Sequence, residues 1–376
     1  MVSVQTIATI VVKVFKIVLN IVILVLYRTG YNGEFLGVGG TWNLNEEKNP
    51  DAEIVASGVI VGYLIYTLVQ VVTFLFGTTE HKRAMSEIVM NFIGVFLWIA
   101  VGAVALHYWG GYQGEHQFQF VFAEKQVGLA VGALCVIQGA VYLLDTALSV
   151  IHFTKEMLKL ECLYSGSLVT ISPRSKNFLQ QFDIIAVKIA PLTDNVSEYG
   201  GGARVVWAMS AGDREAEAQA KKEEGSTSED GRTAVLKQHW CIGLRIVELL
   251  FAVIAIGLMV GALNSHQLAN IDHRHIALIY STYSGFIIIV GVLIIARLLG
   301  ESAGWRTSLG FSIIGAILFT ATAAVIFYDW HRSYYANVRP NKQFYDLVIS
   351  SGVFSIINAV VFIVHAFLTF KKEADY

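Results

Sequence analysis

Eight long apolar runs dominate this sequence and restrict it to a membrane protein. An α-helix needs about 20 mostly apolar residues to cross a bilayer, and each run meets or approaches that length. A polar stretch from Lys155 to about Gln238 divides the runs into two groups of four. We therefore predict an all-α membrane protein: two four-helix transmembrane bundles (eight spans) joined by a polar, partly disordered linker. The runs are Val4–Leu26, Ile54–Phe76, Ile88–Leu106, Val127–Ile151, Ile242–Leu263, Ile276–Leu299, Leu309–Tyr328 and Leu347–Phe370.

Composition supports a lipid environment. Hydrophobic residues make up 55% of the 376 residues and charged residues only 15%, whereas soluble chains carry about 25% charged residues. The net charge of −2 gives no basic surface for nucleic acid. The three cysteines fall outside the expected extracellular loops, so no extracellular disulfide framework is expected.

The predicted domains are residues 1–155, a cytoplasmic linker over 156–238, and residues 239–376. From Met209 onward the linker is charge-balanced and poor in apolar residues, which is typical of disorder. The same stretch also resembles the start of a separate protein. Two interpretations therefore stay open. The linker is either sequence that joins two neighbouring coding units in a fused gene model, or a genuine cytoplasmic tether.

Basic residues orient the spans. Lys82 and Arg83 lie in one short loop, and Lys155 and Lys159 follow the fourth run. Since Lys and Arg concentrate in cytoplasmic loops, we expect a multi-pass membrane protein with both termini cytoplasmic.

Charged residues inside the runs are expected to pair, because an unpaired charge in lipid is costly. Lys13 (or Lys16) and Asp145 lie at similar depths on the first and fourth runs, so we predict that they pair across the bundle. Arg245 and Glu248, three residues apart on one helix, are expected to pair locally. We interpret these pairs as structural pins; the alternatives are lysines that reach the headgroups, or an ion relay.

The loop from Tyr27 to Glu53 is the stretch best suited to contact a partner. It is long, and long ordered loops are usually functional. We predict partner contact through an aromatic and glycine-rich segment; the alternative is a mobile connector. The segment comprises Phe35, Leu36, Gly37, Gly39, Gly40 and Trp42.

No residue set indicates an enzyme. We find no catalytic group and expect no cofactor and no metal site; His266, His273 and His275 are expected to be solvated. His365 is expected to make a hydrogen bond between helices. The alternative function is a multi-span transporter or channel for a small solute, which would require inward ionisable groups near the middle of the membrane.

Motifs in the first half resemble the Snakeskin family over about residues 1–155. They include Gly-Glu-Phe-Leu-Gly-Val-Gly-Gly-Thr-Trp over residues 33–42 and Ala-Leu-His-Tyr-Trp over 105–109. The resemblance implies a four-helix protein of smooth septate junctions at the apicolateral cell junction. It also implies a role in the epithelial paracellular barrier and assembly with a Mesh-like protein and a tetraspanin. Residues of about 238–372 resemble MARVEL-type four-span proteins in layout alone.

Overall fold

The computed structural model describes residues 4–31, 33, 35–38, 50–76, 85–111, 119–165, 240–262, 273–299, 304–336 and 342–374. One compact unit contains Met1–Glu156 together with Ile242–Tyr376, and a second contains Met157–Cys241. Most of the predicted linker lies outside the described residues, so its disorder stays a prediction, as does the division into three domains. The following description concerns the first unit.

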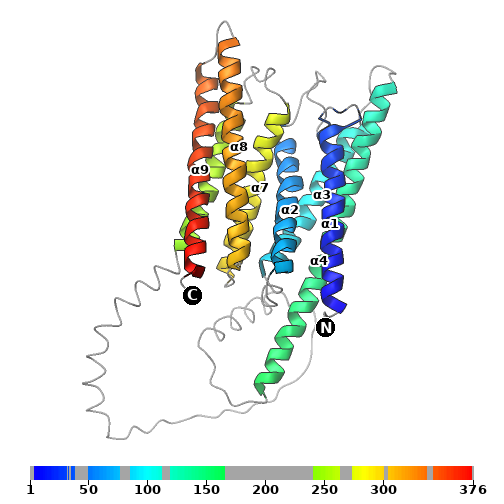
Figure 1. The fold of residues 1–376 in the computed structure, drawn as a ribbon. Helices are drawn as coiled ribbons and strands as arrows, with labels where there is room; N and C mark the ends of the chain where they lie inside the picture. The colour runs from blue at the N-terminus through cyan, green and yellow to red at the C-terminus, as the bar shows by residue number, and fades with distance from the viewer. Residues whose placement is uncertain are drawn as a thin grey trace, which may run out of the picture. The chain divides into compact units, whose positions relative to one another are not determined.

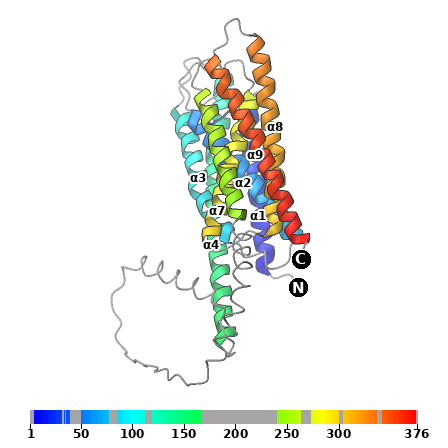
Figure 2. The same cartoon turned by 90° about the vertical axis from the view of Figure 1, so that its left-hand side faces the viewer.

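Eight helices in the described part of the chain are long and apolar enough to cross a membrane. This confirms the predicted all-α fold with two groups of four spans (Figure 1, Figure 2). Seven of these helices are α1 (Val4–Thr29), α2 (Pro50–Phe76), α3 (Met85–Gly111), α4 (Gln119–Ser165), α7 (His273–Leu298), α8 (Trp305–Ala336) and α9 (Lys342–Ala374). The remaining span is the Trp240–Ala262 helix.

Local sequence explains several helix ends. Helix α2 begins at Pro50 and carries Asp51 and Glu53 in its first turn, where proline fits and acidic residues face the positive end of the helix dipole. Helix α1 is followed by Gly30 at φ 50°, and the Gly30 amide donates to the Leu26 carbonyl at 3.0 Å. A left-handed glycine is a common helix terminator.

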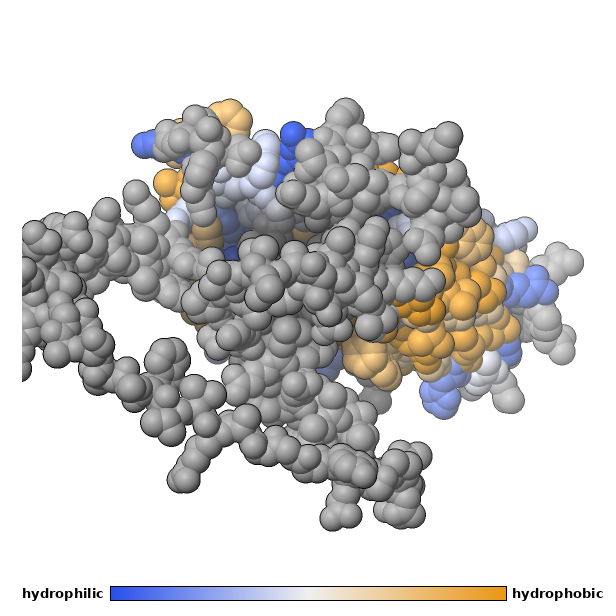
Figure 3. All heavy atoms as spheres, turned by 90° about the horizontal axis from the view of Figure 1, so that it is seen from below, coloured by the Kyte–Doolittle hydropathy of each residue, from blue (hydrophilic) through white to orange (hydrophobic). Residues whose placement is uncertain are grey.

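The distribution of side chains is that of a protein in lipid. Large apolar side chains cover the outer faces of the helices, including Val11, Phe15 and Val18 of α1. Figure 3 shows hydrophobic surface on one flank of the bundle. Charged side chains such as Lys16 and Asp145 are buried inside. Apolar groups face hydrocarbon at little cost, whereas polar groups must find partners within the protein.

An aromatic cluster at the centre of the first four helices is repeated in the second four. Tyr63 and Tyr142 pack edge to face with ring centroids 5.1 Å apart, and Trp98 stacks on Tyr142 at 6.3 Å. A methyl group on Gly94 would lie within 3.1 Å of both tyrosine rings. The corresponding residues of the second group are Phe286, Phe319, Phe362 and Gly315.

The repetition extends to other helix contacts. Gly132 of α4 packs on Leu106 of α3, and Gly352 of α9 packs on Phe327 of α8 in the same way. The pattern of buried positions along α1 recurs along the Trp240–Ala262 helix. The two groups of four helices therefore share one internal packing scheme, although their sequences show no close repeat.

Helices α2 and α7 are the most enclosed of the eight. In the most apolar stretch of each helix, 67% is buried inside the protein. The buried share is 22% in α1 and in the Trp240–Ala262 helix. The two pack against each other (Figure 1). The core thus runs through both groups of helices.

Candidate functional site in two buried polar clusters

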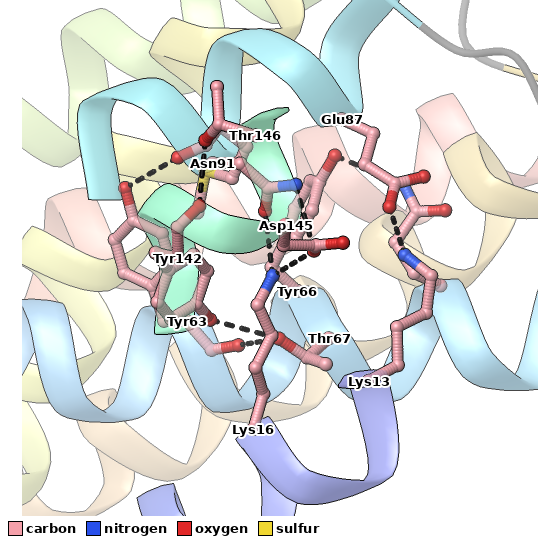
Figure 4. Close-up of polar contacts among 12 residues, drawn as sticks. Lys13, Lys16, Tyr63, Tyr66, Thr67, Glu87, Asn91, Tyr142, Asp145 and Thr146 are labelled. Carbon is pink, nitrogen blue, oxygen red and sulfur yellow. Dashed lines mark hydrogen bonds and ion pairs between the residues drawn. The ribbon is translucent and has the colours of Figure 1, made fainter. Parts of the chain in front are cut away.

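The first polar cluster joins three helices. Lys13 and Lys16 come from α1, Glu87 and Asn91 from α3, and Asp145 from α4 (Figure 4). Lys13 and Lys16 are one helical turn apart, which places both on the face of α1 that turns inward. We call these five residues the lysine cluster.

Lys16 is the central residue of the lysine cluster. Its ammonium group forms an ion pair with Asp145 and donates to Asn91 Oδ1 at 2.9 Å. Asn91 Nδ2 in turn donates to Asp145 Oδ2 at 2.9 Å, so the three side chains form a closed set. The ammonium group also lies 3.8 Å from the centre of the Tyr142 ring, within the range of a cation–π contact.

Lys13 forms a second ion pair, with Glu87. The lysine cluster therefore contains two ammonium groups and two carboxylates in a compact set. Opposite charges in equal number offset the cost of removing each charge from water, provided that the remaining hydrogen bonds are satisfied.

The second polar cluster occupies the corresponding place in the other group of helices. Arg245 Nη1 lies 3.6 Å from Glu248 Oε2, and Arg245 Nη2 donates to Ser308 Oγ of α8 at 2.8 Å. Nδ1 of His365 in α9 is hydrogen-bonded to Glu248 Oε1 at 2.6 Å. Together with Asn358 we call these residues the glutamate cluster.

The two clusters are built to one plan with different side chains. Gln138 of α4 donates to the backbone oxygen of Lys16 at 3.1 Å, and Asn358 of α9 donates to the backbone oxygen of Glu248 at 3.2 Å. Asp145 lies two helical turns after Gln138 and pairs with Lys16 of α1. His365 likewise lies two turns after Asn358 and pairs with Glu248 of the Trp240–Ala262 helix. Fixed amides thus set the register of the fourth helix on the first in each half.

The structure places the predicted charges as follows. Asp145 contacts Lys16, the second of the two lysines considered, while Lys13 contacts Glu87. Arg245 and Glu248 lie side by side at the predicted spacing. Sequence reasoning missed Glu87 because it assigned that residue to a loop, whereas α3 already begins at Met85. It also missed the amide side chains of the two clusters. The signal that could have found Asn358 is its position two helical turns before His365, which repeats the spacing of Gln138 and Asp145.

Part of the predicted contact loop is anchored inside the protein. Leu36 and Gly37 are buried, and Glu53 accepts hydrogen bonds from the Val38 amide at 2.6 Å and the Tyr27 hydroxyl at 2.8 Å. Phe35 packs edge to face on Tyr27 at 5.0 Å. Gly39, Gly40 and Trp42 lie outside the described residues, so contact with a partner stays a prediction.

Of the three histidines considered for a metal, His275 is hydrogen-bonded through Nδ1 to Asp329 at 2.8 Å. His266 lies outside the described residues. Within the described ranges no group of three or more His, Cys, Asp or Glu could hold a metal ion.

The chemistry of the clusters is that of locks between helices. Each buried charge faces a partner on a fixed helix, and each cluster crosslinks the first, third and fourth helices of its group. Removing one member of a buried ion pair would leave the other charge without a partner in apolar surroundings, which is strongly unfavourable. This arrangement holds the helices in one register.

Each half of the chain is matched by a different comparison, one with a family model and one with curated relatives. A family model described as a domain of unknown function (DUF7775) matches residues 238–371. No solved structure matches the chain. The chain is 96% identical to Protein snakeskin of Bombyx mori over 157 residues, which are 42% of this chain and 100% of the relative. It is 59% identical to Protein snakeskin of Drosophila melanogaster over 155 residues, 41% of this chain and 96% of that relative. These matches confirm the resemblance predicted for about residues 1–155, and the chain belongs to the Snakeskin family.

Proposed function

We propose that this protein is a structural component of smooth septate junctions that contributes to the paracellular barrier of an epithelium. The observation that carries the proposal is the 96% identity over the full length of a snakeskin relative. The junction role is what the family resemblance implies. Its site would be the apicolateral plasma membrane, with both termini in the cytoplasm.

The buried clusters support a structural role over transport. The ionisable side chains of the lysine cluster are held by partners on three helices, with Lys16 only 3% exposed and Asp145 only 2% exposed. A carrier needs ionisable groups that can exchange partners with a solute or a proton. Groups fixed in mutual contact favour a rigid scaffold, and the chain is accordingly proposed to have no enzymatic activity.

Partner assembly would use the loop after α1. The described start of this loop, as far as Val38, is held to the bundle by a hydrogen bond to Glu53, which also accepts from Tyr27. We propose that the loop contacts a Mesh-like protein or a tetraspanin, the partners that the family resemblance implies.

The test is placement and assembly of the intact chain in a polarised gut-type epithelium. Tags at each terminus should both stain the apicolateral junction, and depletion should increase paracellular passage of an inert tracer. Trp42→Ala should reduce co-purification with the Mesh-like protein and leave membrane insertion unchanged. Uniform staining of the plasma membrane with an unaltered tracer barrier would contradict the junction role.

A separate measurement addresses the alternative function. The purified chain is reconstituted into lipid vesicles, and the uptake of labelled small solutes and protons is followed. We expect uptake equal to that of empty vesicles. Saturable uptake that Asp145→Asn abolishes would replace the structural proposal with a transporter.

A further inference from the structure

Helices α2 and α7 approach each other most closely at two glycines. A methyl group on Gly62 would lie 2.9 Å from the Cα atom of Gly285, and one on Gly285 would lie 3.2 Å from the Cα atom of Gly62. Four residues earlier, a methyl group on Gly58 would overlap the Ser284 side chain. Small residues at this spacing let two helix backbones meet inside a membrane.

The two glycines hold equivalent positions in the two groups of helices. Each directly precedes an aromatic residue of the central clusters, Tyr63 after Gly62 and Phe286 after Gly285. Contact between equivalent residues is what an interface between two copies related by a two-fold axis produces, because both copies contribute the same surface. The neighbouring contacts show the same symmetry. The third helix of the first group, α3, packs on α7, and the third helix of the second group, α8, packs on α2.

Polar bonds accompany the close approach. The Ser284 hydroxyl donates to the Ile54 carbonyl at 2.9 Å. Arg28 Nη2 donates to the Ala277 carbonyl at 3.0 Å and to Ser281 Oγ at 2.8 Å.

The edge of the contact is built from α2 and α8. The hydroxyl oxygens of Thr73 and Thr307 lie 3.4 Å apart, and the Tyr66 and Phe311 rings stack with centroids 5.6 Å apart. Close van der Waals packing and interhelical hydrogen bonds are among the forces that join helices in lipid.

We propose that the α2 face carrying Gly58 and Gly62 is the dimerisation face of this four-helix fold, and that its partner is a second four-helix unit of the same fold. In this chain residues of about 239–376 supply that unit. The matched snakeskin of Bombyx mori is covered completely by 157 residues, so there the partner would be a separate four-span chain. The proposal does not depend on the junction role.

The experiment keeps the whole chain and cuts it only after assembly. A site-specific protease sequence is inserted after Gly225, and the protein is cleaved in native membranes and then solubilised in mild detergent. A tag on the N-terminal piece should retain the C-terminal piece. In a chain carrying Thr73→Cys and Thr307→Cys, mild oxidation should link the two pieces covalently, because sulfur atoms at the hydroxyl positions come within reach of a disulfide.

Matched variants localise the contact. Gly62→Leu should abolish both retention and the cross-link, whereas Gly291→Leu on α7, where a methyl group meets nothing within 4 Å, should preserve both. The pair Val72→Cys and Thr307→Cys is the register control, because the Val72 side chain is 53% exposed on the outside of α2. Each single-cysteine chain reports the background from the native cysteines.

The results separate the possibilities without relying on a variant that fails to fold. The Thr73 and Thr307 substitutions change little volume, so a failure of that pair to cross-link in the otherwise native chain would overturn the proposal. Equal cross-linking of the Val72 control pair would also overturn it, as would separation of the pieces after cleavage. Retention and a pair-specific cross-link, both lost in Gly62→Leu, would establish the face.

Discussion

Replacing Asp145 by asparagine removes one negative charge from the lysine cluster and almost no volume. The amide oxygen can still accept hydrogen bonds from Lys16 and Asn91, so the hydrogen bonds are largely preserved. Hydrogen bonds between membrane helices contribute about 0.6 kcal/mol on average. The charge of Lys16, however, loses its counter-charge in a site where that side chain is only 3% exposed. Leaving one charge of a buried pair alone costs about 3–5 kcal/mol, so we expect the free energy of unfolding to fall by about 3 kcal/mol.

A triple variant tests the electrostatic reasoning. The variant combines Lys16→Met, Asn91→Leu and Asp145→Leu. It removes both charges of the Lys16–Asp145 pair, and it also removes the Asn91 amide, which would otherwise lose both of its hydrogen-bond partners. Replacing a whole buried polar set by apolar residues of similar volume is often neutral or stabilising. We therefore expect the triple variant to be close to the native protein in stability, although three positions have changed.

The assay is unfolding in mixed micelles of mild detergent and dodecyl sulfate, followed by tryptophan fluorescence. Trp98 stacks on Tyr142 beside the lysine cluster and so reports on this part of the protein. Asp346→Asn, at an exposed carboxylate, is the matched control and should have no measurable effect. A loss below about 1 kcal/mol for Asp145→Asn is the size expected from hydrogen bonding alone, and it would refute the charge argument. A triple variant as unstable as the single one would refute it equally.

Three further predictions use the same assay. Glu248→Ala should cost about 3–5 kcal/mol, because it leaves the buried Arg245 charge without its counter-charge and removes the hydrogen-bond partner of His365; native stability would contradict a locking role. Gly94→Ala should cost about 1–3 kcal/mol by crowding two tyrosine rings, while Gly110→Ala, with open space around it, should cost far less. Gly33→Ala, at φ 80° with no neighbour within 4 Å, should cost about 1–2 kcal/mol. Gly37→Ala should cost more because a methyl group there meets the Glu53 carboxylate; equal losses would show that backbone strain alone acts.

The number and order of the spans follow from the sequence because length and hydropathy alone decide them. Each predicted run corresponds to one observed span, and the main differences are at the ends. Helix α8 continues through Asp329 and Trp330 to Ala336, whereas hydropathy ends the run at Tyr328. A helix can extend past the hydrocarbon wherever its residues tolerate helical geometry, and hydropathy does not detect this.

The pairing of charges was only partly predictable. Depth alone could not distinguish Lys13 from Lys16 as the partner of Asp145, since the two lysines lie one turn apart on the same face. The choice is made by α3, which brings Glu87 to Lys13 and Asn91 to Lys16. Which helix stands beside which is a property of three-dimensional packing, and no residue of α1 encodes it locally.

The shared plan of the two halves escaped sequence reasoning for a chemical reason. The plan is preserved in roles rather than in residue types. Lys16 corresponds to Glu248 and Asp145 to His365, so the sign of the charge at the first of these positions is reversed. A comparison of letters scores such exchanges as unrelated, although both arrangements join the same pair of helices.

The meeting of Gly62 with Gly285 carries a consequence for how such a chain could arise. A contact between counterparts is self-complementary, so a single ancestral four-span protein could have paired with itself through this surface. Divergence of the two sequences would then turn a pair of identical subunits into a specific pair of unlike subunits. Where both units are carried on one polypeptide, their ratio is fixed at one to one.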